Sequence, residues 1–358
     1  MKTQPKSDRT LVVVFLRGGA DGLTLTPPVG NQKYYDVRPN LAVPENEVLK
    51  LGDANFGLNP GMSGLHDIFK DGGLAVAPAV GSDDTTRSHF YAQDLMEHGG
   101  MVAGGWLGRF LRYRDGGNPT ALSAIALNTS MPEVLRGAPA ATVMESMDAF
   151  SLGENAQSFQ AELGKLYRND PTLLGTAARD TLQALDRIAE LTKSSYTPRN
   201  GVKYDDFRFA TRLKQAAQLI RARVGVEAIS LDLGGWDSHF GQSPLITPMI
   251  AQLSKGLTSF YRDLGPLMEK VTVVVMTEFG RRVAENSSFG TDHGRGGSMF
   301  ILSAGNGGTL GTMPELKTGV LVGPGDVPVE TDYRTALQPI LNKHGAGNAM
   351  AKIFPGYA

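Results

Sequence analysis

The chain has 358 residues, with 35 basic and 36 acidic side chains and a net charge of -1 at pH 7. This balance gives no reason to expect a nucleic acid or an anionic membrane as partner. The absence of cysteine excludes disulfides and cysteine-ligated metal sites, so any metal ion must be held by Asp, Glu and His. We expect one large α/β domain over residues 1–358.

Residues 1–10 are polar, and no run approaches the roughly 18 to 20 consecutive apolar residues that span a membrane. No export signal precedes the first predicted strand, so the chain as written is expected in the cytoplasm, or outside it if a signal was removed. The sequence leaves the oligomeric state open.

Apolar runs predict buried strands at residues 11–16 and 74–80 and a short strand at 122–127. Pro78 argues against pairing on both sides of the second of these strands. A helix is predicted from Ser88 to about His98. The pattern then becomes helical between about 151 and 226, which we interpret as a helical insertion.

A strand at 227–233, a long amphipathic helix over 246–264 and a strand at 271–277 are typical of the crossover unit of a parallel sheet. A strand-like run follows at 298–302, one short strand is predicted near 320–322, and a helix from Asp332 to about His344. The predicted fold is α/β, with a mostly parallel central sheet and helices on both faces.

Side chains of the kinds that bind metal ions adjoin several of these strands. They are Asp21, Asp237, His239, Glu278, Asp292 and His293. Ligands of such sheets bind outside the carboxyl ends of the strands, and a doubly wound sheet would bring these residues to one rim. Oxygen and imidazole ligands suit zinc, manganese, iron or calcium, with magnesium where carboxylates dominate.

Each of these residues also has a structural explanation. Asp21 lies in a glycine-rich segment where Asp is a common turn residue, and Glu278 suits the first turn of a helix. Asp237 and His239 can be loop residues bonded to backbone. His293 is the hardest to explain in this way, because its loop is rich in glycine and has no apolar periodicity.

Ser88 opens a predicted helix, where a serine is most often an N-cap. A helix N-terminus also stabilises anions, and a hydroxyl beside a metal ion can act as a nucleophile. Arg87 and His89 flank the serine with groups that can hold a phosphate or sulfate oxygen. Thr86 is the alternative hydroxyl.

Five segments together resemble domain-of-unknown-function family 1501: RGGADGL at 17–23, RSHF at 87–90 with Gln93 and Asp94, GGWDSH at 234–239, TEFGR at 277–281 and DHGRGG at 292–297. They span nearly the whole chain in the expected order. The family in turn resembles the alkaline phosphatase and sulfatase superfamily, which implies an alkaline-phosphatase-like fold. Its members are often exported by the twin-arginine pathway, which implies a periplasmic or secreted location.

The superfamily resemblance implies roles for individual residues. The implied metal ligands are Asp21, Asp237, His239, Glu278 and His293, with Asp292 either a further ligand or a residue that orients a histidine. Ser88 would be the nucleophile, with Arg87 and His89 beside it, and Arg281 and Arg295 would bind the anionic group of the substrate. Asp237 and His239 are closer in sequence than the superfamily's usual pair, so the number of ions stays open at one or two.

Our hypothesis is a metal-dependent hydrolase of phosphate or sulfate esters, acting on a small-molecule or glycan anionic ester. The cofactor would be one or two divalent ions, with zinc, manganese, calcium and magnesium as candidates. Two alternatives stay open: a non-catalytic binding or assembly protein on the same scaffold, and a phosphomutase-like phosphoryl transferase.

Overall fold

The computed structural model describes residues 8–116, 119–153, 156–305 and 307–357. The main sheet of this part of the chain has nine strands, in the order β10-β4-β9-β8-β1-β7-β5-β6, with β11 also paired to β4. The strands are β1 (Thr10–Leu16), β4 (Leu74–Gly81), β5 (Ala124–Ala126), β6 (Thr142–Val143), β7 (Ala228–Leu233), β8 (Val271–Thr277), β9 (Gly297–Leu302), β10 (Gly308–Thr309) and β11 (Thr331–Asp332). A separate small sheet pairs β2 (Leu49–Lys50) with β3 (Gly57–Leu58).

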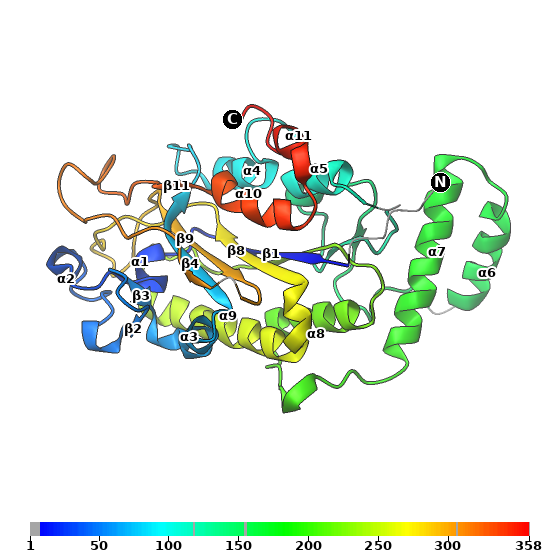
Figure 1. Ribbon diagram of the computed structural model, residues 1–358, viewed down its shortest axis with the longest axis horizontal. Helices are drawn as coiled ribbons and strands as arrows, with labels where there is room; N and C mark the ends of the chain where they lie inside the picture. The colour runs from blue at the N-terminus through cyan, green and yellow to red at the C-terminus, as the bar shows by residue number, and fades with distance from the viewer. Residues whose placement is uncertain (1–7, 117–118, 154–155, 306, 358) are drawn as a thin grey trace.

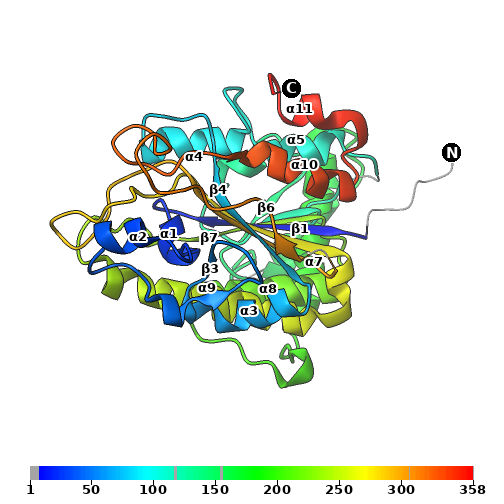
Figure 2. The ribbon, with the colours of Figure 1, turned by 60° about the vertical axis from the view of Figure 1, so that its left-hand side comes forward.

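Helices cover both faces of the sheet (Figures 1 and 2). One layer contains α3 (Ser63–Lys70), α8 (Arg208–Arg221) and α9 (Gln242–Leu264), and the other contains α4 (His89–His98), α5 (Trp106–Tyr113), α10 (Tyr333–Lys343) and α11 (Met350–Ile353). Two short helices, α1 (Gly22–Leu25) and α2 (Gln32–Val37), follow β1. The predicted fold class, a mostly parallel sheet between two helical layers, is confirmed.

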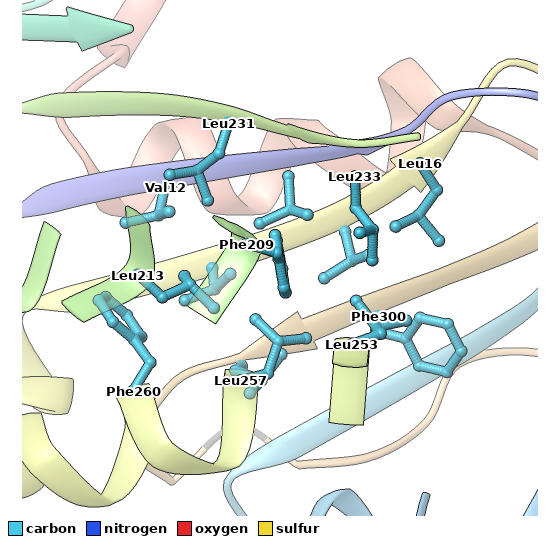
Figure 3. Packing of buried hydrophobic residues seen from close by; sticks show 14 of the residues in the cluster. Val12, Leu16, Phe209, Leu213, Leu231, Leu233, Leu253, Leu257, Phe260 and Phe300 are labelled. Carbon is cyan, nitrogen blue, oxygen red and sulfur yellow. The ribbon is translucent and has the colours of Figure 1, made fainter. Parts of the chain in front are cut away.

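The core under one face joins the sheet to α8 and α9. Phe209 and Leu213 of α8 and Leu257 of α9 pack with residues of β1 and β7, as Figure 3 shows. Burial of each such side chain contributes about 2 kcal/mol. This packing fixes the positions of the strands and hence of the loops that follow them.

Strand β9 runs antiparallel to both of its neighbours, β8 and β4, whereas β1 is parallel to β7 and β8. The amino end of β9 therefore lies at the rim where β1, β4, β7 and β8 end. Because of this reversal, residues just before β9 meet residues just after the parallel strands.

Strand β4 is paired on both sides, which the sequence argument from Pro78 had disfavoured. It pairs with β9 on one side, and with β10 and β11 on the other. Pro78 lies between the stretches that pair with β10 and β11, and the β9 register shifts between Pro78 and Val80. The missing N–H therefore falls where the ladder is already interrupted.

The segment 151–226 contains α6 (Ala156–Tyr167), α7 (Leu173–Thr192) and α8. α6 and α7 pair with each other and stand away from the sheet in Figure 1, whereas α8 packs against α9. No helix within the described ranges has the long apolar stretch that a membrane span requires.

The short strand predicted near 320–322 is wrong. Val322 forms only an isolated antiparallel bridge with Asp326. Gly319, Gly323 and Gly325 have positive φ angles, so the backbone turns too often here for a strand to extend.

Candidate metal centre

Four side chains with nitrogen or oxygen ligand atoms converge at the rim of the sheet. His89 is the first residue of α4, Asp237 and His239 lie in the loop after β7, and His293 lies in the loop before β9. Within the described residues, one group of three or more such side chains, His89, Asp237 and His293, has ligand atoms that all lie within 4.8 Å of one another. His239 adjoins this group.

Several separations between these atoms match those of ligands on one small ion, with His239 lying outside the group of three. The Nε2 atoms of His239 and His293 are 2.9 Å apart. Asp237 Oδ1 is 3.2 Å from His239 Nε2 and 3.4 Å from His293 Nε2, and Asp237 Oδ2 is 3.5 Å from His89 Nε2. Four ligands bound tetrahedrally to zinc at its usual bond lengths lie about 3.3 Å from one another.

The other ring nitrogen of each histidine faces an oxygen. His89 Nδ1 is 2.8 Å from Glu278 Oε1, His239 Nδ1 is 3.4 Å from Asp292 Oδ1, and His293 Nδ1 is 2.8 Å from the carbonyl oxygen of Arg87. These oxygens can only accept, so a neutral ring with its proton on Nδ1 keeps each contact and offers a lone pair on Nε2. Oxygen partners of this kind orient the histidines of metal sites.

His89 Nε2 shows whether the residues of the cluster suit a bound metal ion. This atom is buried and has no hydrogen-bond partner. A buried nitrogen acceptor without a partner is costly, and a cation at the centre of the cluster would satisfy it. The residues therefore fit a bound metal ion.

The charges around the cluster shift the pKa values of its members. Burial raises the pKa of Asp237, but the Arg281 guanidinium, with His89 and His239, overcomes this and lowers the pKa to about 2. The hydrogen bond that His89 donates to Glu278 raises the pKa of His89, and burial, together with nearby cations, lowers the pKa of His293. Asp237 is therefore ionised at neutral pH, as a metal ligand requires.

Arg281 is 1% exposed, and its guanidinium is fully engaged within the protein. It donates to the carbonyl oxygens of Gly19 and Thr291 at 2.7 and 2.9 Å and to Asp237 Oδ1 at 2.7 Å. The predicted contact between Arg281 and substrate does not fit this burial, because each of the three guanidinium nitrogens already donates within the protein. Arg281 instead holds Asp237 in place.

Asp21 lies outside the cluster, although it was a predicted ligand. Its carboxylate accepts hydrogen bonds from Arg38 Nη1 at 2.6 Å, from Gln242 Nε2 at 2.6 Å and from the Thr24 hydroxyl at 2.7 Å. It also caps α1 by accepting from the N–H of Leu23. Both oxygens are used, so Asp21 acts here as a buried partner of Arg38.

Two other predicted ligands contact histidines. Glu278 is buried and accepts from His89, from Gln93 Nε2 at 2.9 Å and from the Gly18 N–H at 2.9 Å. Asp292 faces His239 Nδ1, which is the orienting role left open by the sequence. The sequence missed His89 as a potential ligand and treated it as a catalytic neighbour of Ser88.

Ser88 occupies the N-cap position of α4, but its side chain makes no capping hydrogen bond. Its neighbours on both sides contact the cluster, Arg87 through its carbonyl oxygen and His89 through its ring. The Arg87 side chain is engaged elsewhere, donating to the buried Asp326. Arg295 is partly buried and donates to the carbonyl oxygens of Ser82 and Asp84.

The loops that carry Arg281 and His293 are joined backbone to backbone. The Gly280 N–H donates to the Arg295 carbonyl at 2.8 Å, and the Gly294 N–H donates to the Gly280 carbonyl at 2.8 Å. A Cβ atom at Gly294 would lie 2.5 Å from the carbonyl carbon of Arg281. Only glycine therefore permits this close approach.

Among solved structures with similarity, the C-terminal periplasmic domain of EcEptC from Escherichia coli, in complex with Zn, is 9% identical, with 83% of this chain and 74% of that chain covered and a TM-score of 0.34. Ps i-CgsB is 10% identical, with 94% and 72% covered and a TM-score of 0.36. Alkaline phosphatase from the Antarctic bacterium TAB5 is 8% identical, with 85% and 95% covered and a TM-score of 0.27. Similarity at this level does not extend to the chemistry of the site.

No curated protein matches the sequence. A family model does match, over residues 77–345, a range that includes His89, Asp237, His239, Glu278 and His293. The chain belongs to the family described as Protein of unknown function (DUF1501).

Proposed function

We propose that His89, Asp237, His239 and His293 bind one divalent metal ion, and that the protein uses this centre to hydrolyse phosphate or sulfate esters. The observation that carries the proposal is the convergence of three Nε2 atoms on one carboxylate, with each Nδ1 facing an oxygen.

The ligand set favours zinc over calcium or magnesium, because three of its four members are imidazoles. Manganese and iron are the next candidates. The set also favours one ion over two, since Asp21 is engaged by Arg38 and Glu278 by His89. A bound divalent ion would lower the pKa of a coordinated hydroxyl or water and neutralise anionic charge.

Ser88 is the proposed nucleophile. Its hydroxyl has no capping role, it adjoins His89, and it lies at the amino end of α4, where backbone N–H groups favour an anion. In the proposed reaction, the Ser88 oxygen attacks phosphorus or sulfur, the ester bond breaks and the alcohol departs with a proton. Water then displaces the serine and releases phosphate or sulfate.

The three predicted arginines have different proposed roles. Arg295 is the arginine of the predicted set that we retain for the anion, because it is partly exposed and bonded only to carbonyl oxygens. Arg87 contributes its carbonyl oxygen to the orientation of His293. Arg281 contributes by holding Asp237.

Metal analysis tests the first half of the proposal. After dialysis against zinc and removal of excess ion, the wild-type protein should retain about one zinc per chain by mass spectrometry, and His293→Ala should retain almost none. His66→Ala, at a histidine on α3, is the matched control and should behave as wild type. Equal zinc content in wild type and His293→Ala would overturn the assignment.

Hydrolysis of aryl phosphates and aryl sulfates by the zinc-loaded protein tests the second half. Ser88→Ala should lower kcat by at least a hundredfold while zinc content is unchanged. A Ser88→Ala variant with full activity would remove the nucleophile from the proposal. Zinc binding without turnover of either ester would favour the non-catalytic alternative, and a rearranged phosphorylated product would favour the phosphomutase-like one.

A further inference from the structure

Two exposed phenylalanines lie on loops that carry or adjoin residues of the cluster. Phe240 follows His239 directly and is 69% exposed, and Phe289 is 57% exposed. Their loops are joined by two hydrogen bonds, from the Gly241 N–H to the Ser288 carbonyl and from the Gln242 N–H to the Phe289 carbonyl, each 2.8 Å long. The two rings therefore start from adjacent backbone at the same rim as the histidines.

The backbone at Phe289 is strained. Its φ angle is +58°, a region that large side chains seldom occupy. The next residue must be glycine, because a side chain at Gly290 would collide with the backbone of His239. An exposed aromatic ring on a strained backbone gains nothing from packing, and strain of this kind persists mainly where it serves a function.

The Phe289 loop is tied to the residues that orient His239. Asn286 Nδ2 donates to the His239 carbonyl at 2.9 Å and to Asp292 Oδ1 at 3.2 Å. Asn286 Oδ1 accepts from the N–H groups of Ser288 and Gly290 at 2.9 and 3.1 Å. One asparagine thus fixes the position of Phe289 relative to the cluster.

We propose that Phe240 and Phe289, the phenylalanine pair, bind a flat apolar group, an aryl group above all, on the ligand whose anionic end lies at the histidine cluster. The inference rests on the proposed function, because the cluster supplies the anchor for the anion. The pair adds no charge or hydrogen-bond donor of its own. The phenylalanine pair would therefore determine which organic groups the protein prefers on the ester, and not how tightly it binds the anion.

The test compares phosphonates that cannot be hydrolysed. Isothermal titration calorimetry of the zinc-loaded protein should show phenylphosphonate binding about tenfold more tightly than methylphosphonate. In the Phe240→Ala/Phe289→Ala double variant, this preference should fall to about twofold or less, with methylphosphonate affinity unchanged. Phe159→Ala on α6, at another exposed phenylalanine, is the matched control and should keep the tenfold preference.

A preference that survives in the double variant would overturn the assignment. So would a pair that favours phosphocholine over phenylphosphonate, because the ligand would then be a cation. If neither phosphonate binds, the phosphate-ester form of the proposed function fails, and titration with neutral benzyl alcohol by NMR tests the pair alone. In that titration, saturable shifts that are lost in the double variant support the aromatic subsite, and shifts that persist in the double variant reject it.

Discussion

His239 Nε2 lies 2.9 Å from His293 Nε2, although the residues are 54 positions apart in the chain. Each ring faces an oxygen acceptor through Nδ1, and in the neutral tautomer that donates to this oxygen neither Nε2 carries a proton. Two lone pairs would then face each other at hydrogen-bond distance. A cation between the rings removes this repulsion, and the predictions about metal binding follow from that relationship.

Zinc should stabilise the wild-type protein against unfolding. A ligand that binds only the folded state at a hundred times its Kd adds about 2.7 kcal/mol to the free energy of unfolding. Urea titrations with and without zinc would measure this gain, which should vanish in His239→Ala and persist in His66→Ala. An equal gain in all three proteins would mean that zinc acts elsewhere.

Glu278→Gln should weaken zinc binding about 10- to 100-fold, although Glu278 is not placed as a ligand. The carboxylate accepts from His89 Nδ1, and residues in this orienting position typically have effects of that size. Competition with a chelator of known zinc affinity would measure the change. Glu162→Gln, on the exposed face of α6, is the control, and equal affinities for the two variants would contradict the orienting role.

Arg38→Met should destabilise the fold by about 3–5 kcal/mol, because it leaves the Asp21 carboxylate buried without its ionic partner. The zinc content of the folded protein should stay near one per chain. Urea unfolding and metal analysis would be made on the same samples. Loss of zinc from well-folded Arg38→Met would return Asp21 to the list of ligands.

His344 should make stability depend on pH. Burial, together with nearby Arg9 and Lys343, lowers the pKa of this histidine to about 4, while the unfolded chain titrates near 6.5. The unfolded state therefore binds the proton first, and about 3 kcal/mol of stability should be lost as the pH falls from 7 to 4.

His344→Gln should remove this part of the pH dependence. The titration is done in chelator, so that metal release does not contribute. The difference between the two proteins isolates His344, because the cluster histidines titrate in both. Parallel stability curves for wild type and variant would show that His344 does not carry the effect.

The strands of the sheet were predictable because their apolar runs are continuous. The run at 271–277 coincides with β8, and that at 11–16 lies within β1. The rim location of Asp237, His239 and His293 was predictable from their places beside strands. The role of His293 depends on the antiparallel direction of β9, which the sequence pattern does not encode.

The partners of individual side chains were beyond prediction from the sequence. Asp21 precedes α1 in the sequence and Arg38 follows α2. Their spacing of 17 residues is not one that predicts a buried ion pair. His89 follows a serine at a helix start, a pattern that predicts a role for the hydroxyl. Its position as a neighbour of Asp237 comes from the packing of α4 against the rim, which involves residues 148 positions apart.

The glycine contacts between the Gly280 and Gly294 loops have a consequence for how an ion enters. The loops that carry Arg281 and His293 are joined backbone to backbone and so keep their relative positions before any ion arrives, while Arg281 holds Asp237. The metal ion should then bind to ligands that are already in place, without the coupled folding that a zinc finger needs. Its calorimetric signature would be a heat-capacity change near zero and uptake as fast as the ion sheds its water.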